Sequence, residues 1–285
     1  MTERFLITAA TGQVGPHVAR SLIDKGHAVR ALVVEGDERA SVLPDEVETV
    51  TGSLDDPATV EAALDDVSHV FWMWPFFYLP TVTAPAMVER MSERALRVCV
   101  VSSVGVHIGV ERSDNNCHAY LEELLGASRC RWTSLRTTGF MGNARGWAPQ
   151  IRGSDVVRFP YGDARRTPVH ERDLAEAGVH ALLDDRHVGH AYLVSGAEAL
   201  SQREQVRIIG ETLGRDIGWI DVEADEARVQ MVATGWPPSY ADGALDYFRR
   251  LTGEAEVSSD AVAILTGRPA ASFRDWAQEN ADVFR

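Results

Sequence analysis

Side chains that could move a proton lie close together in one segment of the sequence. His118, Tyr120 and Glu122 fall within a stretch of helical periodicity, 116–125, and Ser102 stands at the end of an apolar strand pattern. Residues four apart share a helix face, so His118 and Glu122 are expected to pair. A carboxylate beside an imidazole raises the imidazole pKa and favours its protonated form. This spacing predicts that His118, or Tyr120, donates a proton to a substrate; a His–Glu pair on the helix surface is the alternative.

A glycine-containing turn near the N-terminus is suited to a phosphate group. The segment from Ile7 to Gly15 follows an apolar strand and opens a helical pattern. Glycines there let the backbone turn tightly and approach a pyrophosphate, which then lies at the helix N-terminus. We therefore expect bound NADP or NAD, with the preference open; a scaffold that has lost its cofactor is the alternative. The residues expected at the dinucleotide are Thr8, Ala9, Thr11, Gly12, Gln13, Val14, Gly15, Glu35, Ser53, Leu54, Ser102 and Ser103.

Glu35 is the acidic residue in this set. It lies twenty residues after Gly15, about where a carboxylate binds the ribose 2′-hydroxyl in NAD-type sites. Its charge would repel a 2′-phosphate, although Arg30 or Arg39 could compensate. A solvated loop residue is an equally weighted interpretation of Glu35.

An aromatic segment, 71–78, follows the fourth expected strand. Phe71 and Trp72 are expected in the core, whereas the following residues are broken by Pro75 and suit the wall of an apolar pocket. Such a wall favours a flat, apolar substrate, and plain packing is the alternative. The residues expected to contact substrate are Trp74, Phe76, Phe77, Tyr78, Phe140, Met141, Asn143 and Trp147, with Asn143 as a helix cap the alternative at that position.

The elements that must position these residues alternate along the first two thirds of the chain. Apolar runs predict strands at 4–9, 28–34, 47–51, 69–72, 97–102 and 130–135, separated by helical patterns at 14–25, 57–64, 84–95 and 116–125. This alternation predicts an α/β fold, a Rossmann doubly wound parallel sheet. From residue 201 onward the pattern is mostly helical, which predicts a small, mostly helical C-terminal lobe.

The domain division follows from this change of pattern. We expect a dinucleotide-binding core formed by 1–140 plus about 171–196. A substrate-binding lobe is expected from 141–170 and 197–285. In open α/β sheets, ligands bind at the carboxyl ends of the strands.

Several of these segments together resemble one known family. They are Ile7–Gly15, Val101–Gly105, His118 with Glu122, Trp132–Arg136 running into Phe140–Asn143, Asp173–Ala175, and Leu265–Pro269 with Ser272-Phe273. In this order they resemble the NmrA-like branch of the atypical short-chain dehydrogenase/reductases. The resemblance runs nearly end to end and implies the Rossmann fold and an NAD(P) site. It says less about activity, because such proteins include reductases, redox-sensing regulators and proteins of unknown role.

The chain departs from that family at three places. Ala9 stands where glycine is usual, Val34-Glu35 where an arginine often meets the 2′-phosphate, and Ser53 where aspartate usually follows Gly52. The proton-transfer pair of ordinary short-chain dehydrogenases, a tyrosine with a lysine four residues later, is also missing. Tyr120 is followed at that spacing by Leu124, and the one lysine of the chain is Lys25. That mechanism is therefore excluded.

The amino-acid composition limits the classes of molecule that the protein is expected to bind. The 285 residues carry a net charge of −14, which argues against nucleic acid and anionic membranes because phosphates would be repelled. The three cysteines have no disulfide or metal spacing and suit a reducing compartment. We therefore expect a cytoplasmic protein without a signal peptide, a membrane span or a metal, either a monomer or a homodimer.

The sequence favours an NAD(P)H-dependent reductase of an apolar aromatic or quinone-like carbonyl compound. A non-catalytic NmrA-like redox sensor that binds a dinucleotide and a protein partner is the second reading. A redox-free cyclase or isomerase on the same fold is the third. The changes at Ala9, Val34 and Ser53 favour the second and third readings.

Overall fold

The structure is a computed structural model that describes residues 3–75, 79–110 and 117–285. The chain divides into two compact units. Unit 1 comprises Met1–Thr137, Glu171–Leu193 and Ile264–Gly267, and unit 2 comprises Thr138–His170, Val194–Ala263 and Arg268–Arg285. Among the described residues, no helix has both the length and the apolar character required to cross a bilayer.

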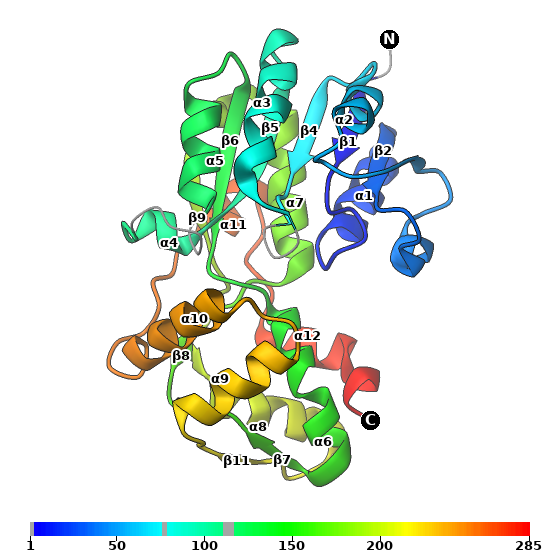
Figure 1. Cartoon of the computed structure of the whole chain (residues 1–285). Coiled ribbons are helices and arrows are strands. Elements are labelled where there is room, and N and C mark those ends of the chain that lie inside the picture. The colour runs from blue at the N-terminus through cyan, green and yellow to red at the C-terminus, as the bar shows by residue number, and fades with distance from the viewer. Residues whose placement is uncertain (1–2, 76–78, 111–116) are drawn as a thin grey trace. The chain divides into compact units, whose positions relative to one another are not determined.

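Unit 1 is built on a seven-stranded sheet with the strand order β3-β2-β1-β4-β5-β6-β9, and the pairs from β3 through β6 are all parallel (Figure 1). This order reverses direction between β1 and β4, as in doubly wound folds, so the predicted fold class is confirmed. The strands are β1 (Arg4–Ile7), β2 (Ala28–Val33), β3 (Glu48–Thr51), β4 (His69–Trp72), β5 (Arg97–Ser103), β6 (Arg131–Thr137) and β9 (Ala191–Val194).

Helices cover both faces of this sheet. Helices α2, α3 and α5 pack side by side on one face, and α1 and α7 pack together on the other (Figure 1). Their bounds are α1 (Gly15–Asp24), α2 (Pro57–Leu64), α3 (Ala84–Glu93), α5 (Cys117–Gly126) and α7 (Glu171–Leu183), with the short helices α4 (Val104–His107) and α11 (Ala261–Thr266).

The start of α2 shows how local sequence sets an element boundary. The Asp56 carboxylate accepts hydrogen bonds from the backbone nitrogens of Ala58 at 3.1 Å and Thr59 at 3.3 Å. Pro57 occupies the first turn, where a missing N–H costs nothing. The helix therefore begins where the Asp-Pro pair predicts.

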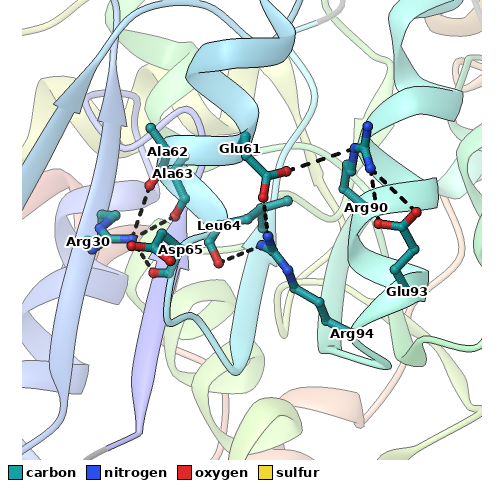
Figure 2. A network of polar contacts seen from close by, with 9 residues as sticks. All are labelled: Arg30, Glu61, Ala62, Ala63, Leu64, Asp65, Arg90, Glu93 and Arg94. Carbon is teal, nitrogen blue, oxygen red and sulfur yellow. Dashed lines mark hydrogen bonds and ion pairs between the residues drawn. The ribbon is translucent and has the colours of Figure 1, made fainter.

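The end of α2 is held by arginines from neighbouring elements (Figure 2). Arg30 of β2 donates to the carbonyls of Ala62 and Ala63 at 3.2 Å each and to that of Asp65. Arg94, the residue directly after α3, donates to the Leu64 carbonyl at 2.8 Å. Cations stabilise the carbonyl-rich end of a helix. These contacts fix α2 against both the sheet and α3.

Two boundaries differ from prediction because of backbone conformation. The first strand was expected to reach Ala9 but ends at Ile7, since Ala9 has a positive φ of 49° that no strand accommodates. The helix expected to reach Ala95 ends at Glu93, and Ala95 likewise has a φ of 49°. A left-handed alanine is uncommon and carries no distinctive sequence signal.

Unit 2 consists of helices around two small sheets, in which β10 pairs antiparallel with β8 and β11 pairs parallel with β7. Its core contains Met141, Ile151, Val206, Phe273 and Trp276. The helices are α6 (Ala148–Ser154), α8 (Gln202–Leu213), α9 (Ala224–Ala233), α10 (Pro238–Arg250) and α12 (Phe273–Glu279); the strands are β7 (Val156–Arg158), β8 (Arg165–Arg166), β10 (Leu200–Ser201) and β11 (Gly218–Ile220).

Candidate functional site

The turn from β1 into α1 has the shape of a phosphate cradle. Gly12 N–H donates to the Ala9 carbonyl at 3.0 Å, which closes the turn. A Cβ at Gly15 would overlap the carbonyl of Ala10, so only glycine allows the helix to begin this close to the loop. Val14, the residue that caps α1, makes no side-chain cap hydrogen bond, and the first turn of α1 carries no acidic residue. A helix N-terminus of this kind suits an anionic pyrophosphate, so these residues fit the expected dinucleotide.

Thr8 fixes the start of the cradle to the neighbouring strand. Its Oγ1 donates to the Met73 carbonyl at 2.8 Å and accepts from the Met73 N–H at 2.9 Å. The side chain is therefore fully committed to joining the ends of β1 and β4. Its contribution to a cofactor site is to hold the loop rather than to contact a ligand.

A second polar cluster joins the cradle to the end of β2. Thr11 donates from Oγ1 to Oδ2 of Asp37 at 2.6 Å, and Arg39 donates from Nε to Oδ1 of Asp37 at 2.8 Å. The side-chain hydrogen bond from Arg39, followed by that from Thr11, holds the Asp37 pKa well below its usual range. Glu35, the residue expected at a ribose, is exposed. The carboxylate that reaches the glycine turn is thus Asp37, which sequence reasoning missed; the cap position of Asp37, before the turn Glu38–Val42, is the signal that could have found it.

Two residues expected at the cofactor, Ser53 and Leu54, follow β3 and differ in their burial. Leu54 is in the hydrophobic core with Leu32 and Val60, so its side chain is unavailable to a ligand. Ser53 is half-buried, and its carbonyl accepts from Asp56 N–H at 3.2 Å. Apolar packing holds the Leu54 side chain, and the place of this residue at the cofactor stays a prediction.

Glu122 of α5 is the centre of the other predicted cluster. Its carboxylate accepts from Ser102 Oγ at 2.5 Å, from Ser134 Oγ at 2.8 Å, and from Arg136 Nε and Nη2 at 3.0 and 2.6 Å. Ser102 and Arg136 are register partners on β5 and β6, so one helix carboxylate ties two strand ends together. Burial acts to raise the Glu122 pKa, but the hydrogen bonds from Arg136, Ser102 and Ser134 outweigh it and lower that pKa. The Glu122 carboxylate is therefore ionised, and its oxygens are engaged by the donors of Ser102, Ser134 and Arg136.

His118 does not become the protonated donor that the spacing predicts. Burial lowers its pKa to about 4, and the opposing influence of Glu122 is smaller. The expectation was wrong because the carboxylate is drawn toward Ser102, Ser134 and Arg136, while partial burial of the imidazole disfavours its charged form. At neutral pH His118 is uncharged. Tyr120, on the same helix, is half-buried.

Trp74, the first residue of the predicted aromatic wall, is buried. Trp74 is only 2% exposed, lies in the core of unit 1 and donates from Nε1 to the Leu79 carbonyl at 3.0 Å. Its assignment to a substrate pocket is therefore wrong, since the side chain completes the packing around Trp72. The predictions for Phe76, Phe77 and Tyr78 lie outside the described residues.

The remaining members of the predicted wall belong to unit 2. Met141 is 3% exposed and part of that unit's core, so it offers no surface to a ligand and its prediction is also wrong. Phe140 and Trp147 are half-buried, and Trp147 packs edge-on against Trp219 with ring centroids 5.7 Å apart. Asn143 is exposed, and its N–H donates to the Phe140 carbonyl at 3.2 Å. Among the described members of the predicted set, Phe140, Asn143 and Trp147 remain accessible.

The described residues contain no cluster of side chains that could hold a metal ion. Over 3–75, 79–110 and 117–285, no cluster of three or more histidine, cysteine, aspartate or glutamate side chains is arranged to hold an ion. Cys99, Cys117 and Cys130 are all buried. Burial raises the pKa of the Cys117 thiol to about 11, so it is protonated at neutral pH.

Several curated proteins are similar in sequence to this chain. Among curated proteins, a (4-alkanoyl-5-oxo-2,5-dihydrofuran-3-yl)methyl phosphate reductase of Streptomyces griseus is 41% identical over 57% of this chain and 58% of its own. An NAD(P)H azoreductase of Xenophilus azovorans is 29% identical over 54% of each protein. The chain thus spans a little over half the length of these two relatives. An uncharacterized oxidoreductase of Bacillus subtilis is 28% identical over 97% of this chain and 94% of its own.

Solved structures share the fold over nearly the whole chain. A triphenylmethane reductase of Citrobacter sp. has a TM-score of 0.80 at 20% identity, covering 98% of this chain and 99% of that one. An NADPH-dependent quinone oxidoreductase of Escherichia coli has a TM-score of 0.78 at 19% identity, covering 96% and 98%. At these identities the likeness establishes the fold alone.

The decisive match is to a family. Residues 9–185 fit the sequence profile of the family described as NAD(P)H-binding, and this range begins within the glycine turn and ends after α7. The match confirms the expected NAD(P)-type cofactor, and with the shared fold it confirms the NAD(P)-binding Rossmann part of the resemblance. The chain belongs to the NAD(P)H-binding family.

Proposed function

We propose that the protein is an NAD(P)H-dependent reductase of an apolar aromatic or quinone-like carbonyl compound. The observation that carries this proposal is the 41% identity to a relative named as a reductase of an oxo-dihydrofuran. The other relative at comparable coverage is named an NAD(P)H azoreductase. The cradle formed by Gly12 and Gly15 supplies the place for the cofactor that such a reaction needs.

The chemistry of the site limits the kind of acceptor. When bound, NAD(P)H supplies a hydride, so the acceptor gains negative charge that a proton must neutralise. Ser102 has one hydroxyl proton, and its Oγ directs that proton to Glu122 at 2.5 Å. Ser102 therefore acts as a hydrogen-bond acceptor, and Glu122 is a positioning residue that fixes its orientation.

The proton donor on α5 is a weak acid. With a pKa lowered to about 4 by burial, His118 is neutral at pH 7 and offers at most an imidazole N–H. Tyr120 is the other donor on this helix, and it has no lysine four residues later to increase its acidity. An isolated ketone accepts hydride as a localised alkoxide, whose charge must be stabilised by an acidic donor as it develops, and neither group is acidic enough to do this efficiently.

A conjugated acceptor removes this difficulty. In a quinone, the incoming charge spreads over the ring and leaves a phenol-like oxygen, which needs no strong acid nearby. The reductase relatives are named for an oxo-dihydrofuran and an azo compound, which share this electron-poor conjugation. The absence of a Tyr–Lys pair and the neutral state of His118 thus favour quinone-like carbonyl compounds over simple ketones.

The test compares acceptors matched in size. Purified protein with NADH or NADPH is given an apolar quinone and the corresponding saturated cyclic ketone, and cofactor oxidation is followed by absorbance. We expect turnover with the quinone and none with the ketone. Equal turnover of both would contradict the argument from the weak donor. Cofactor binding without oxidation by any conjugated acceptor would favour the redox-sensor reading.

A further inference from the structure

Arg136, the residue before the last of β6, uses only one edge of its guanidinium to hold Glu122. Nε donates to Oε1 at 3.0 Å and to Oε2 at 3.3 Å, and Nη2 donates to Oε2 at 2.6 Å. Within residues 3–75, 79–110 and 117–285, the third nitrogen, Nη1, makes no hydrogen bond or ion pair. The side chain is 25% exposed, and Nη1 is not shut off from solvent. The guanidinium therefore keeps donors for a ligand.

The pairing with Glu122 fixes the direction of these donors. A guanidinium is planar, so Nη1 lies opposite the edge through which Nε and Nη2 face the carboxylate. Glu122 is itself held by Ser102 Oγ at 2.5 Å and by Ser134 Oγ at 2.8 Å. Because the cation is already held in place, a ligand that binds to Nη1 does not have to order a free side chain.

The cluster lies at the end of the sheet where ligands bind. Arg136 and Ser102 are register partners near the carboxyl ends of β6 and β5, and α5 packs on both strands (Figure 1). Ligands of open α/β sheets bind outside these ends. Three strand spacings of about 4.8 Å separate β6 from β1, which leads into the phosphate cradle, so Arg136 lies about 14 Å from it along the sheet. Arg136 is thus placed for a substrate rather than for the phosphates of a dinucleotide.

The proposed reaction produces a charge that this cation can stabilise. A quinone that receives a hydride from the reduced cofactor gains one hydrogen and two electrons and becomes a monoanion as the cofactor is oxidised. A proton from water then gives the hydroquinone. His118 on α5 is neutral and supplies no strong acid, so the anionic oxygen needs another source of stabilisation. A fixed cationic donor in a partly desolvated site is such a source.

We propose that Arg136 is a catalytic residue whose Nη1 donates a hydrogen bond to the acceptor oxygen and stabilises the negative charge that forms there. Glu122 positions this cation. The inference rests on the proposed reductase function and supplies the charge stabilisation that the donors of α5 do not. The net charge of −14 gives an anion no general attraction to the protein, so a preference for a bound anion reports a cation in the site.

Binding of 4-nitrophenol tests the inference without turnover, because its phenol and phenolate forms absorb at different wavelengths. The whole protein with excess NADP⁺ is titrated with this compound at pH values on both sides of its ionisation. We expect the phenolate to bind roughly 10- to 100-fold more tightly than the phenol, the factor of a charge-assisted hydrogen bond. Arg136→Gln should bring the two affinities together. Arg136→Lys should fall between them, because lysine keeps the charge but loses the fork of donors.

The matched control is Arg131→Gln. Arg131 lies on the same strand and pairs with a carboxylate, that of Asp185 at 2.6 Å, but at the amino end of β6. This variant should keep the wild-type preference, and thermal unfolding should show that all variants are folded. If Arg136→Gln does not fold, the comparison is made with Arg136→Lys, which retains a cation beside Glu122.

Three results would each overturn the role of Arg136: equal affinities for the two forms in the wild type, an unchanged preference in Arg136→Gln, or failure of both forms to bind. Quinone turnover is measured separately. Turnover by the wild type together with any of these results leaves the reductase function standing. A phenolate preference that disappears in Arg136→Gln, without quinone turnover by the wild type, overturns the reductase function and not the anion contact.

Discussion

At the scale of single residues, Glu122 organises the carboxyl end of the sheet in unit 1. Ser102, Ser134 and Arg136 come from two neighbouring strands, and each donates to the same carboxylate. Arg136 is a quarter exposed and Glu122 is 11% exposed, so solvent screens the pair only in part. Replacing one carboxylate oxygen by an amide nitrogen would leave the Arg136 guanidinium without its counter-charge and set a donor against it.

We therefore predict that Glu122→Gln lowers the free energy of unfolding by about 2 kcal/mol, less than for a fully buried pair because of the partial exposure. The matched control is Glu93→Gln, which breaks an ion pair between groups that are 52% and 53% exposed (Figure 2). That change should cost less than about 0.5 kcal/mol. Chemical denaturation of both variants provides the measurement, and equal losses would show that Glu122 is an ordinary surface carboxylate.

The sequence predicted which polar residues lie near the site, but it did not predict their hydrogen-bond partners. The i, i+4 spacing of His118 and Glu122 is a short-range signal, whereas Ser102 and Arg136 lie 20 and 14 residues away from Glu122. Only the register of β5 and β6 brings those partners together. The state of His118 was mispredicted for the same reason, because burial is a property of the packed structure.

At the scale of elements, the turn between β1 and α1 depends on close backbone approach. At Gly12 an added Cβ would lie 3.1 Å from the Ala9 carbonyl oxygen, a tight contact that requires a small shift of the neighbouring backbone. At Gly15 the conflict is far larger, because the Cβ would overlap backbone atoms of Ala10, which cannot move without displacing the buried end of β1. Packing therefore requires glycine at position 15 more strictly than at position 12.

Gly15→Ala should accordingly lower stability by roughly 1–3 kcal/mol, the usual cost of overpacking, and weaken NADPH binding by displacing the cradle. Gly126→Ala is the control, because an added Cβ there meets nothing within 4 Å. It should change stability by no more than about 0.5 kcal/mol and leave cofactor affinity unchanged. Thermal unfolding and cofactor titration of the two variants decide the matter: similar behaviour would mean that the turn tolerates a side chain.

Elements were predictable where the signals are local. The span of α8, Gln202–Leu213, follows from apolar periodicity and a capping box between Ser201 and Glu204, and that of α2 from Asp56-Pro57. Trp74 shows the limit of such reasoning. Its neighbour Pro75 suggested a break from the core, yet the indole packs beside Trp72 with ring centroids 6.0 Å apart. The sequence pattern of a tryptophan after a strand is the same whether the side chain lines a pocket or packs in the core.

At the scale of the whole molecule, the family match and the sheet order agree on a dinucleotide-binding protein. The alternation of strands and helices sufficed to predict this fold, since a parallel sheet with right-handed crossovers allows few other arrangements. The contacts around the candidate cofactor site were harder to predict. Thr11 donates to Asp37, which lies 26 residues later, and no periodic sequence pattern indicates such a contact.

The central claim is that this protein passes a hydride from its cofactor to a conjugated carbonyl compound. Its most direct test is a single-turnover experiment, in which protein loaded with one equivalent of NADPH is mixed without oxygen with excess quinone. Absorbance of the reduced nicotinamide and of the quinone is followed together. We expect NADPH and quinone to be consumed at one rate and in equal amounts. NADPH that stays bound and reduced while the quinone is unchanged would contradict it.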